Sequence, residues 1–318
     1  MSSKSMIAAV SLALLGSTTA GQAQTVSDDP LSQGRVLQLS FGLFAPQNTL
    51  QDTLTTANGG GPQVQSTDLL DFGNGGRFAL DYSQPWGGSR LVFSLAGSRV
   101  TGETTVDIGG KAESFPGSYD NGYNLPGYWV VGAEVETKLA LLSVGREWQL
   151  GGNWKVSGGF QGGQASQDLT AEVSAVSGNP PELTVSSQTN NRMLGVFGGL
   201  SHYAALGDTM GLRLSATLGV MRNKFDYTYK TVDTGGIVYQ QIEASSTGTA
   251  VSSKLSARLE RSLSEKGVLS LEIGYEGLQG IGNGADTLLD PAGTATTAHV
   301  DSDRIGGGYV SLGYAFRF

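Results

Sequence analysis

An imidazole and two carboxylates alternate near the C-terminal end of the sequence, at His299, Asp301 and Asp303. Residues at two-residue spacing lie on the same face of a β-strand, so these three side chains can share one surface. A histidine beside carboxylates is suited to general acid–base catalysis. The segment also begins like a calcium loop, but Ile305 stands where a third oxygen ligand is required. This is the one cluster in the chain that merits consideration as a catalytic site.

Other catalytic signatures are missing from the sequence. It contains no G-x-S-x-G motif, no Walker A loop, no H-E-x-x-H motif and no dinucleotide fingerprint. The second histidine, His202, lies in an apolar segment next to Tyr203, which is more typical of an interfacial or lumen residue than of a base. With no cysteine, disulfides and thiolate metal sites are excluded. We therefore expect a protein that is not an enzyme and has no cofactor.

A larger set of ionisable residues alternates with apolar ones. Arg213 lies between Leu212 and Leu214, and Glu272 follows Leu271 in the same way. This alternation gives a strand one apolar and one polar face. Charges on the polar faces either pair with one another or line a narrow water path. The residues expected on the polar faces are Arg77, Asp81, Arg90, Lys155, Arg213, Lys254, Arg258, Glu260, Glu272 and Glu276.

The elements that must position these charges are β-strands. The 48 glycines and the low content of charged residues, 15%, suit many twisted strands and turns better than helices. No charge run, proline-rich hinge or fixed-period repeat divides the 318 residues, which favours one domain. Alternation predicts ten strands, near residues 34–45, 75–84, 89–106, 134–150, 154–169, 191–206, 211–230, 247–264, 267–277 and 304–318.

The connections between these strands are alternately short and long. Glycine-rich or polar tight turns, such as Gly151-Gly152-Asn153, join one set of strand ends. The other ends are joined by long segments, at residues 46–74, 107–133, 170–190, 231–246 and 278–303. Short turns on one rim and long loops on the other, with both chain ends on the short side, are typical of a membrane β-barrel.

The N-terminal residues predict export. Lys4 precedes an apolar stretch from Met6 to Leu15, followed by small and polar residues up to Ala23. We interpret residues 1–23 as a signal peptide cleaved near Ala23, and residues 24–318 as the barrel. No later run of about 18 apolar residues occurs, so a transmembrane helix is not expected.

The last strand places an apolar or aromatic residue at every second position and ends on phenylalanine. This pattern resembles the assembly signal of bacterial outer-membrane β-barrels. The resemblance implies a transmembrane antiparallel up-and-down β-barrel of about ten strands in the outer membrane of a Gram-negative bacterium. Its expected partners are outer-membrane lipid, lipopolysaccharide and the barrel-assembly machinery. The residues that carry the resemblance are Val310, Leu312, Tyr314, Phe316 and Phe318.

The strand count has alternatives of eight and twelve. A further hairpin hidden in residues 46–74 or in residues 128–135 would give twelve strands and make an open channel more plausible. Three tryptophans, Trp86, Trp148 and Trp154, lie in or beside the short turns, where an interfacial aromatic girdle is expected. Turn-capping or core tryptophans are the alternative explanation.

The five long segments are strongly acidic. They contain 14 of the 28 Asp and Glu residues, and Lys111 is their only Lys or Arg. Such a mouth attracts small cationic solutes or divalent cations, although acidic loops also serve solubility alone. The acidic chain shows no basic stripe interleaved with aromatics, which argues against nucleic-acid binding.

Three functions are compatible with these sequence features. The first is a porin-like barrel that passes or binds small solutes through a narrow polar lumen behind an acidic extracellular mouth. The second is a structural or surface-recognition barrel with a plugged interior, acting in adhesion or envelope integrity. The remote third rests on the similarity of the His299 cluster to omptins, ten-stranded outer-membrane proteases that use an Asp pair with a His and an Asp. Here the cluster lies in one segment rather than on facing strands.

Overall fold

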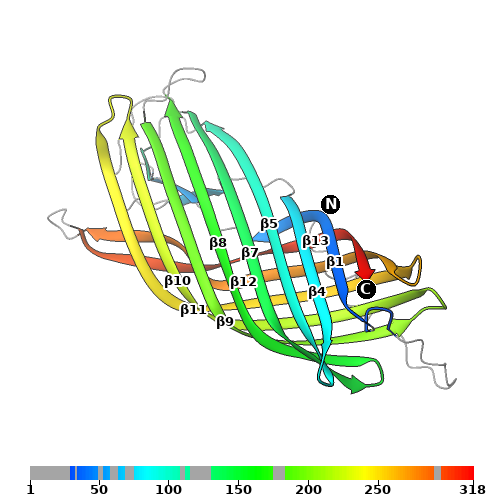
Figure 1. The fold of residues 1–318 in the computed structure, drawn as a ribbon. Coiled ribbons are helices and arrows are strands. Elements are labelled where there is room, and N and C mark those ends of the chain that lie inside the picture. Colours follow the sequence, from blue (N-terminus) through cyan, green and yellow to red (C-terminus); the bar gives the residue numbers. More distant parts are fainter. Residues whose placement is uncertain are drawn as a thin grey trace.

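The computed structural model describes residues 29–32, 34–48, 53–57, 64–68, 75–107, 112–114, 130–174, 183–289 and 295–318. In these ranges the protein is all-β, and no helix is long and apolar enough to cross a membrane. Ten strands form a closed antiparallel barrel, tilted steeply as Figure 1 shows. In ring order they are β1 (Val36–Asn48), β13 (Ala295–Arg317), β12 (Gly267–Leu289), β11 (Val238–Ser262), β10 (Met210–Asp233), β9 (Leu183–Ala205), β8 (Trp154–Ser174), β7 (Val130–Gly151), β5 (Ser89–Asp107) and β4 (Gly75–Trp86).

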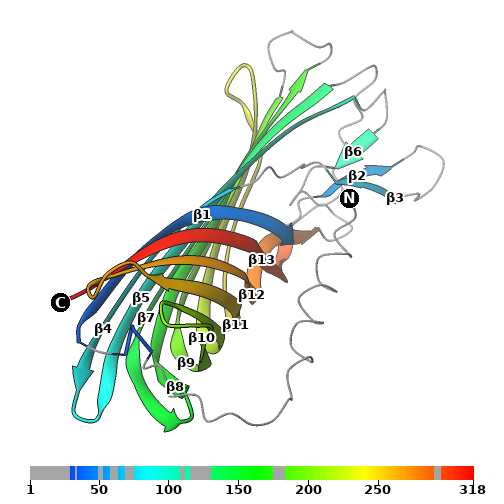
Figure 2. The ribbon, with the colours of Figure 1, turned by 90° about the vertical axis from the view of Figure 1, so that its right-hand side faces the viewer.

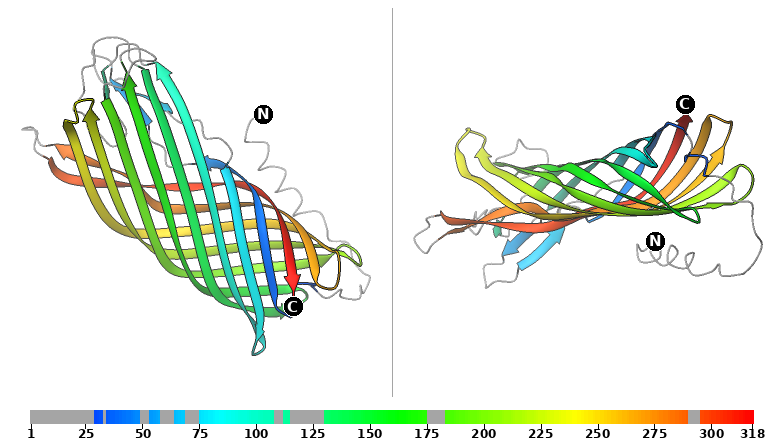
Figure 3. Two further views of the ribbon diagram at one scale, coloured as in Figure 1. Left: turned by 45° about the horizontal axis from the view of Figure 1, so that its top comes forward. Right: turned by 60° about the horizontal axis from the view of Figure 1, so that its bottom comes forward.

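The ring closes where the first strand meets the last. β1 pairs with β13, with Leu39 opposite Tyr314, and its other edge pairs with β4 (Figure 3). The Arg35 N–H donates to the Phe318 carbonyl at 3.1 Å, and the Phe318 N–H donates to the Arg35 carbonyl at 3.0 Å. No barrel strand is therefore left with an unpaired edge. The predicted antiparallel up-and-down barrel of about ten strands is confirmed.

Short turns join the strands at one end of the barrel, here named the turn end, and the opposite end is named the loop end. The turns need left-handed backbone conformations, with φ of 52° at Gly87, 77° at Gly88 and 67° at Asn153. Glycine and asparagine adopt these angles at little cost, which explains their place in the sequence. The chain enters β1 and leaves β13 at the same turn end.

Most strands run further toward the loop end than the sequence predicts. β11 has 25 residues and β12 has 23, whereas only 247–264 and 267–277 were expected. About 9–11 residues suffice to cross a bilayer. Beyond that length both faces of a strand can be polar, so hydrophobic alternation disappears while the backbone ladder continues. Parts of the expected loops 170–190, 231–246 and 278–303 are therefore strand.

A hairpin does occur within residues 46–74, formed by β2 (Thr53–Ala57) and β3 (Val64–Asp68). It pairs with β6 (Ala112–Ser114) in a three-stranded sheet of its own, outside the barrel ring (Figure 2). The hairpin consequently adds no strand to the barrel, which remains ten-stranded rather than twelve-stranded.

The large apolar side chains point outward. Phe41, Phe160, Leu194 and Leu218 are each more than 60% exposed, whereas the residues that alternate with them are largely buried. The belt that they form extends over β1 and over β7 to β13. Its most exposed members also include Leu43, Leu142, Val144, Val196, Leu200, Val220, Leu255, Leu271, Ile273, Val310, Leu312 and Phe316.

Aromatic side chains mark the turn end of this belt. Trp86, Trp148 and Trp154 are exposed there, together with the terminal Phe318. The Arg146 guanidinium lies 5.7 Å from the centre of the Trp86 ring, and the rings of His202 and Trp154 are 4.6 Å apart. Arg146 and His202 therefore lie beside exterior tryptophans.

Candidate functional site

The barrel interior brings the candidate charges together. The structure places all the residues expected on polar faces inside the ring, where they contact partners on neighbouring or facing strands. β4 supplies Arg77 and Asp81, β5 supplies Arg90, β8 supplies Lys155, β10 supplies Arg213, β11 supplies Lys254, Arg258 and Glu260, and β12 supplies Glu272 and Glu276.

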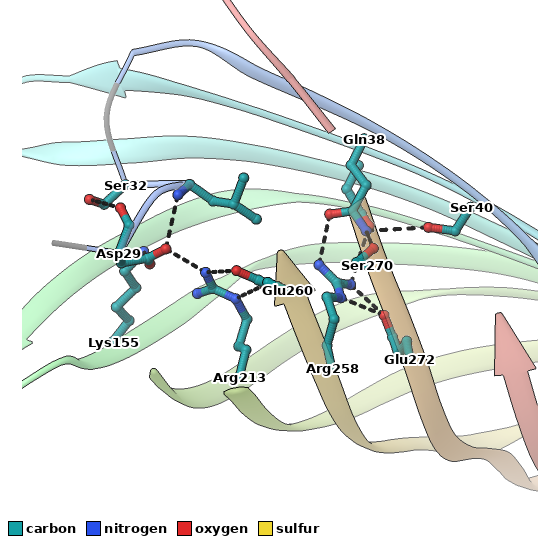
Figure 4. A network of polar contacts seen from close by, with 12 residues as sticks. Asp29, Ser32, Gln38, Ser40, Lys155, Arg213, Arg258, Glu260, Ser270 and Glu272 are labelled. Carbon is teal, nitrogen blue, oxygen red and sulfur yellow. Dashed lines mark hydrogen bonds and ion pairs between the residues drawn. The ribbon is translucent and has the colours of Figure 1, made fainter. Parts of the chain in front are cut away.

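At the turn end the charges meet around Asp29, which precedes β1 (Figure 4). The Arg213 guanidinium donates to Asp29 Oδ1 at 2.6 Å and to Glu260 Oε1 at 2.8 Å. Lys155 Nζ lies 2.7 Å from Asp29 Oδ2 and 3.2 Å from Glu147 Oε1. One carboxylate thus joins β8 and β10 through their cations.

The Asp29 side chain is ionised in this setting. Burial by itself raises the pKa of its carboxyl, but the positive charges and hydrogen bonds of Arg213 and Lys155 outweigh burial. The net result is a pKa well below the usual range of an aspartate. Asp29 therefore contributes a full negative charge at neutral pH.

Side chains of the ring anchor the segment that carries Asp29 at the turn end. Leu31 packs in an apolar cluster with Val36, Val268 and Ala315. The Arg90 guanidinium donates to the carbonyl oxygens of Ser32, at 2.6 Å, and Gly34, at 3.0 Å. The Arg317 side chain donates to the Pro30 carbonyl at 3.1 Å. We name the described residues 29–32 and 34 the N-terminal cap.

A second group of charges lies deeper in the barrel, around Glu272. The Arg258 Nε–H donates to Glu272 Oε2 at 2.7 Å, and another Arg258 N–H donates to Gln38 Oε1 at 2.8 Å (Figure 4). Lys254 Nζ is 3.2 Å from Glu272 Oε1, and the Tyr309 hydroxyl donates to the same oxygen at 2.5 Å. All the partners of this carboxylate come from strands of the ring.

Next to Glu272 lies a third group of charges, the ion pair between Arg77 and Glu276. Arg77 donates through Nε and Nη2 to Glu276 Oε2, at 3.1 and 3.0 Å, and its guanidinium stacks 3.9 Å from the centre of the Tyr309 ring.

Counted together, the three groups of charges are electrically balanced. Six carboxylates, Asp29, Asp81, Glu147, Glu260, Glu272 and Glu276, accompany six cations, Arg77, Arg90, Lys155, Arg213, Lys254 and Arg258.

A cavity of about 170 Å³ remains between the N-terminal cap and the Arg258 group. Its lining combines the polar and charged residues Gln38, Asp81, Glu147, Lys155 and Arg258 with apolar residues such as Leu31 and Phe93. The Ser94 hydroxyl donates to Asp81 at 2.6 Å, and Arg258 is 3.8 Å from its other oxygen. The volume suffices for about five waters or one small solute.

Toward the loop end the interior holds apolar side chains together with uncharged polar ones such as Gln161, Asn223 and Ser252. The apolar side chains form a cluster of Leu139, Ala165, Met193, Met221, Ala250, Leu278, Ile281 and Ile305. On one side of this cluster, the side chain of Asn191 on β9 reaches the backbone of Gly282 on β12. We name this level of the interior the constriction.

Sequence reasoning missed Asp29, Glu147 and the constriction. Glu147 was not among the charges expected on polar faces, and Asp29 lies in a stretch with no alternation. A carboxylate close to an expected cleavage site, followed by Pro30 and Leu31, is the one sequence feature that hints at an ordered cap. No periodicity connects it to Arg213, because the two residues are 184 positions apart.

Some candidate residues fall outside what is described. The side chains of His299, Asp301 and Asp303 are not among the described ones, although their backbone belongs to β13, with His299 opposite Asp286. Of the 14 loop acids, Glu172 and Glu243 are exposed and Asp233 is half-buried, while the other side chains lie outside the described residues. In the described part of the chain, no group of His, Asp or Glu has the arrangement of a metal site.

Comparisons with known proteins concern the fold alone. No protein-family model matches the chain, and no curated protein matches it. The outer-membrane protease OmpT of Escherichia coli aligns with 10% identity and a TM-score of 0.44, covering 93% of this chain and 100% of that one. The translocator domain of the autotransporter NalP of Neisseria meningitidis aligns with 14% identity and a TM-score of 0.39, covering 99% and 97%. The COG4313 outer-membrane channel of Pseudomonas putida F1 aligns with 12% identity and a TM-score of 0.30, covering 94% and 100%. The solved structures to which this chain is similar are thus bacterial outer-membrane β-barrel proteins.

Proposed function

We propose that this protein is a non-enzymatic, porin-like barrel of the Gram-negative outer membrane, which passes or binds small solutes and is closed at rest. The observation that carries the proposal is the combination of an exposed apolar belt with a cavity inside the ring that charged residues line in part. A water-soluble barrel would place its apolar side chains inside. Here they surround a charged interior, which is the reverse arrangement and the one suited to lipid.

Two features of the interior support a closed resting state. The N-terminal cap borders the cavity at the turn end, since its Leu31 lines the cavity beside Lys155 and Arg213, the two cations that contact Asp29. The constriction covers it from the loop end, because apolar side chains and the Asn191 contact join facing walls. A solute can cross only when both are displaced.

Cations are the expected solutes, and the outer-membrane surroundings supply the expected partners. The interior itself is balanced in charge, so preference comes from the acidic long segments, which concentrate cations and divalent ions within about 8 Å of the surface at physiological salt. Outer-membrane lipid, lipopolysaccharide and the barrel-assembly machinery remain the proposed partners.

Planar-bilayer conductance of the refolded protein tests this proposal. The double substitution Asp29→Asn and Leu31→Asn loosens the cap, and Asp208→Asn is the matched control because Asp208 is an exposed acid in a turn at the same end. We expect rare cation-preferring steps for the wild type and the control, and frequent ones for the double variant. Equal silence in all three would contradict a cap-gated pore.

A second candidate is the plugged barrel whose work is done at its surface, in adhesion or envelope integrity. It is favoured by the constriction, where the Asn191–Gly282 contact and the apolar cluster lie inside the ring. Combining the cap variant with Met193→Ser and Met221→Ser tests it. Silence of this protein, once its insertion into vesicles has been verified, supports the plugged barrel, and discrete steps support the pore.

A further inference from the structure

A group of positive charges lies on the outer surface, directly beyond the apolar belt. Along β10 the exposed residues run from Leu218 and Val220 to Arg222 and Lys224. Arg192 on β9 is the cross-strand partner of Lys224. All three cations are exposed, and they come immediately after the last apolar position on the loop-end side of the belt.

This arrangement is electrostatically unfavourable on its own. Side chains directly opposite each other on antiparallel strands have Cβ atoms about 5 Å apart, and like charges at that spacing are destabilising. Within the described residues, Lys224 contacts Asp226 at 3.3 Å, while neither Arg192 nor Arg222 has an ion pair. One carboxylate therefore faces three cations, which leaves room for an external anion.

A hollow lies beside these charges. It has a volume of about 460 Å³ and is lined by Val220, Met221, Arg222, Thr247, Gly248 and Thr249. Thr247 is the cross-strand partner of Lys224, and Thr249 is that of Arg222, so two exposed residues with hydroxyl groups stand next to the cations.

We propose that this surface binds the phosphate group of an anionic lipid headgroup in the leaflet at the loop end. Guanidinium, ammonium and hydroxyl groups are the donors that a phosphate accepts from. The apolar edge of the hollow, at Val220, continues into the belt, so a ligand held here has its charged part against Arg222 and its hydrocarbon part against Leu218 and Val196. A lipid has both parts, whereas free phosphate has one.

The inference rests on the proposed membrane location and deepens it by naming a lipid contact. The triple substitution Arg192→Gln, Arg222→Gln and Lys224→Gln removes the charges from exposed positions. The matched control, Lys230→Gln, Arg261→Gln and Lys266→Gln, removes three equally exposed charges elsewhere. Both proteins are refolded in neutral detergent, and their insertion is measured by flotation with neutral phosphatidylcholine vesicles.

Native mass spectrometry then measures binding of bisphosphorylated lipid A and of its phosphate-free form. We expect the wild type and the control to bind the bisphosphorylated lipid, and the triple variant to bind it at least tenfold more weakly, since each cation contributes to attraction near an anionic headgroup. Equal binding by the triple variant and the control, or equal binding of the phosphate-free lipid, would overturn the proposal. Full competition by inorganic phosphate at the same concentration would also overturn it. The flotation measurement distinguishes failure of the membrane location from failure of the lipid site. A wild-type protein that does not float with the vesicles contradicts the membrane location, whereas a triple variant that floats but binds the bisphosphorylated lipid as the control does contradicts only the lipid site.

Discussion

The side-chain amide of Asn191 pairs with the backbone of Gly282 on a strand that is not its neighbour. Asn191 Nδ2 donates to the Gly282 carbonyl at 3.0 Å, and the Gly282 N–H donates to Asn191 Oδ1 at 2.8 Å. Two strands, β10 and β11, separate β9 from β12 in the ring. The amide therefore spans the interior, and Asn223 on β10 extends the contact by donating to Asn191 Oδ1 at 2.8 Å.

Replacing Asn191 by alanine should destabilise the barrel. The substitution leaves the buried N–H and carbonyl of Gly282 without their partner, which costs about 1–3 kcal/mol. The free energy of unfolding in urea, measured for protein refolded in vesicles, gives this value directly. Asn190→Ala is the control, because Asn190 lies next in the chain and its amide contact is exposed. Equal free energies of unfolding of the two variants would show that the Asn191 contact does not stabilise the barrel.

The N-terminal cap should depend on the charge of Asp29. Asp29→Asn removes charged hydrogen bonds worth about 1.5–3 kcal/mol, so backbone amides of the cap should exchange with deuterium roughly tenfold faster or more. The Leu31 N–H, which donates to Asp29 Oδ1 at 2.9 Å, is the most direct probe. If the exchange rates of the cap amides are the same in this variant as in the wild type, Asp29 does not hold the cap in place.

The pH dependence of the same exchange follows from the lowered pKa of Asp29. A carboxyl whose pKa is depressed in the folded state stabilises it fully above the unfolded pKa, and this contribution is lost as the pH falls through the folded pKa. Protection of the cap should therefore be constant from neutral pH down to about 5 and decline only in stronger acid. Asp29→Asn should lack that acid-dependent decline.

Closure of the ring should depend on the absence of a side chain at Gly42. A Cβ atom there would lie 2.1 Å from the Val310 carbonyl oxygen and 2.6 Å from Ser311 Cβ, so β1 and β13 would have to separate. Gly42→Ala should cost about 1–3 kcal/mol as an overpacked contact. On gels of samples heated to increasing temperatures, the band should change from its folded to its unfolded mobility at a lower temperature than in the wild type. Gly76→Ala, on the neighbouring β4 with nothing within 4 Å of its Cβ, should leave that temperature unchanged.

The apolar belt gives a test of the surrounding solvent. Leu218→Arg puts a charge on the outer face within the belt, which in a bilayer costs about 1–4 kcal/mol depending on depth. Thr228→Arg makes a similar change at an exposed position further along β10, where about 0–1 kcal/mol is expected. Unfolding in urea from vesicles compares the two. Equal costs would indicate that Leu218 does not face hydrocarbon.

Much of this protein can be derived from local patterns. Alternation at Leu212, Arg213 and Leu214 determines which side chains share a face, and glycine or asparagine at the short turns determines where strands reverse. The inward positions of Arg77, Glu272 and the other candidate charges follow from the same period of two, because a strand has only two faces. Ring closure, predicted from the alternation of short and long connections and from the resemblance of the last strand, is seen in the β1–β13 ladder.

What the sequence could not supply are contacts between residues that are distant in the chain. Asp29 meets Arg213, Gln161 accepts a hydrogen bond from Ser252, and Asn191 meets Gly282 only after the ring has closed and brought facing walls together. Strand periodicity fixes the direction of a side chain but carries no information about what lies opposite. That depends on the tilt, register and cross-section of the whole barrel, and so the tertiary structure alone decided that the interior is paired, capped and constricted.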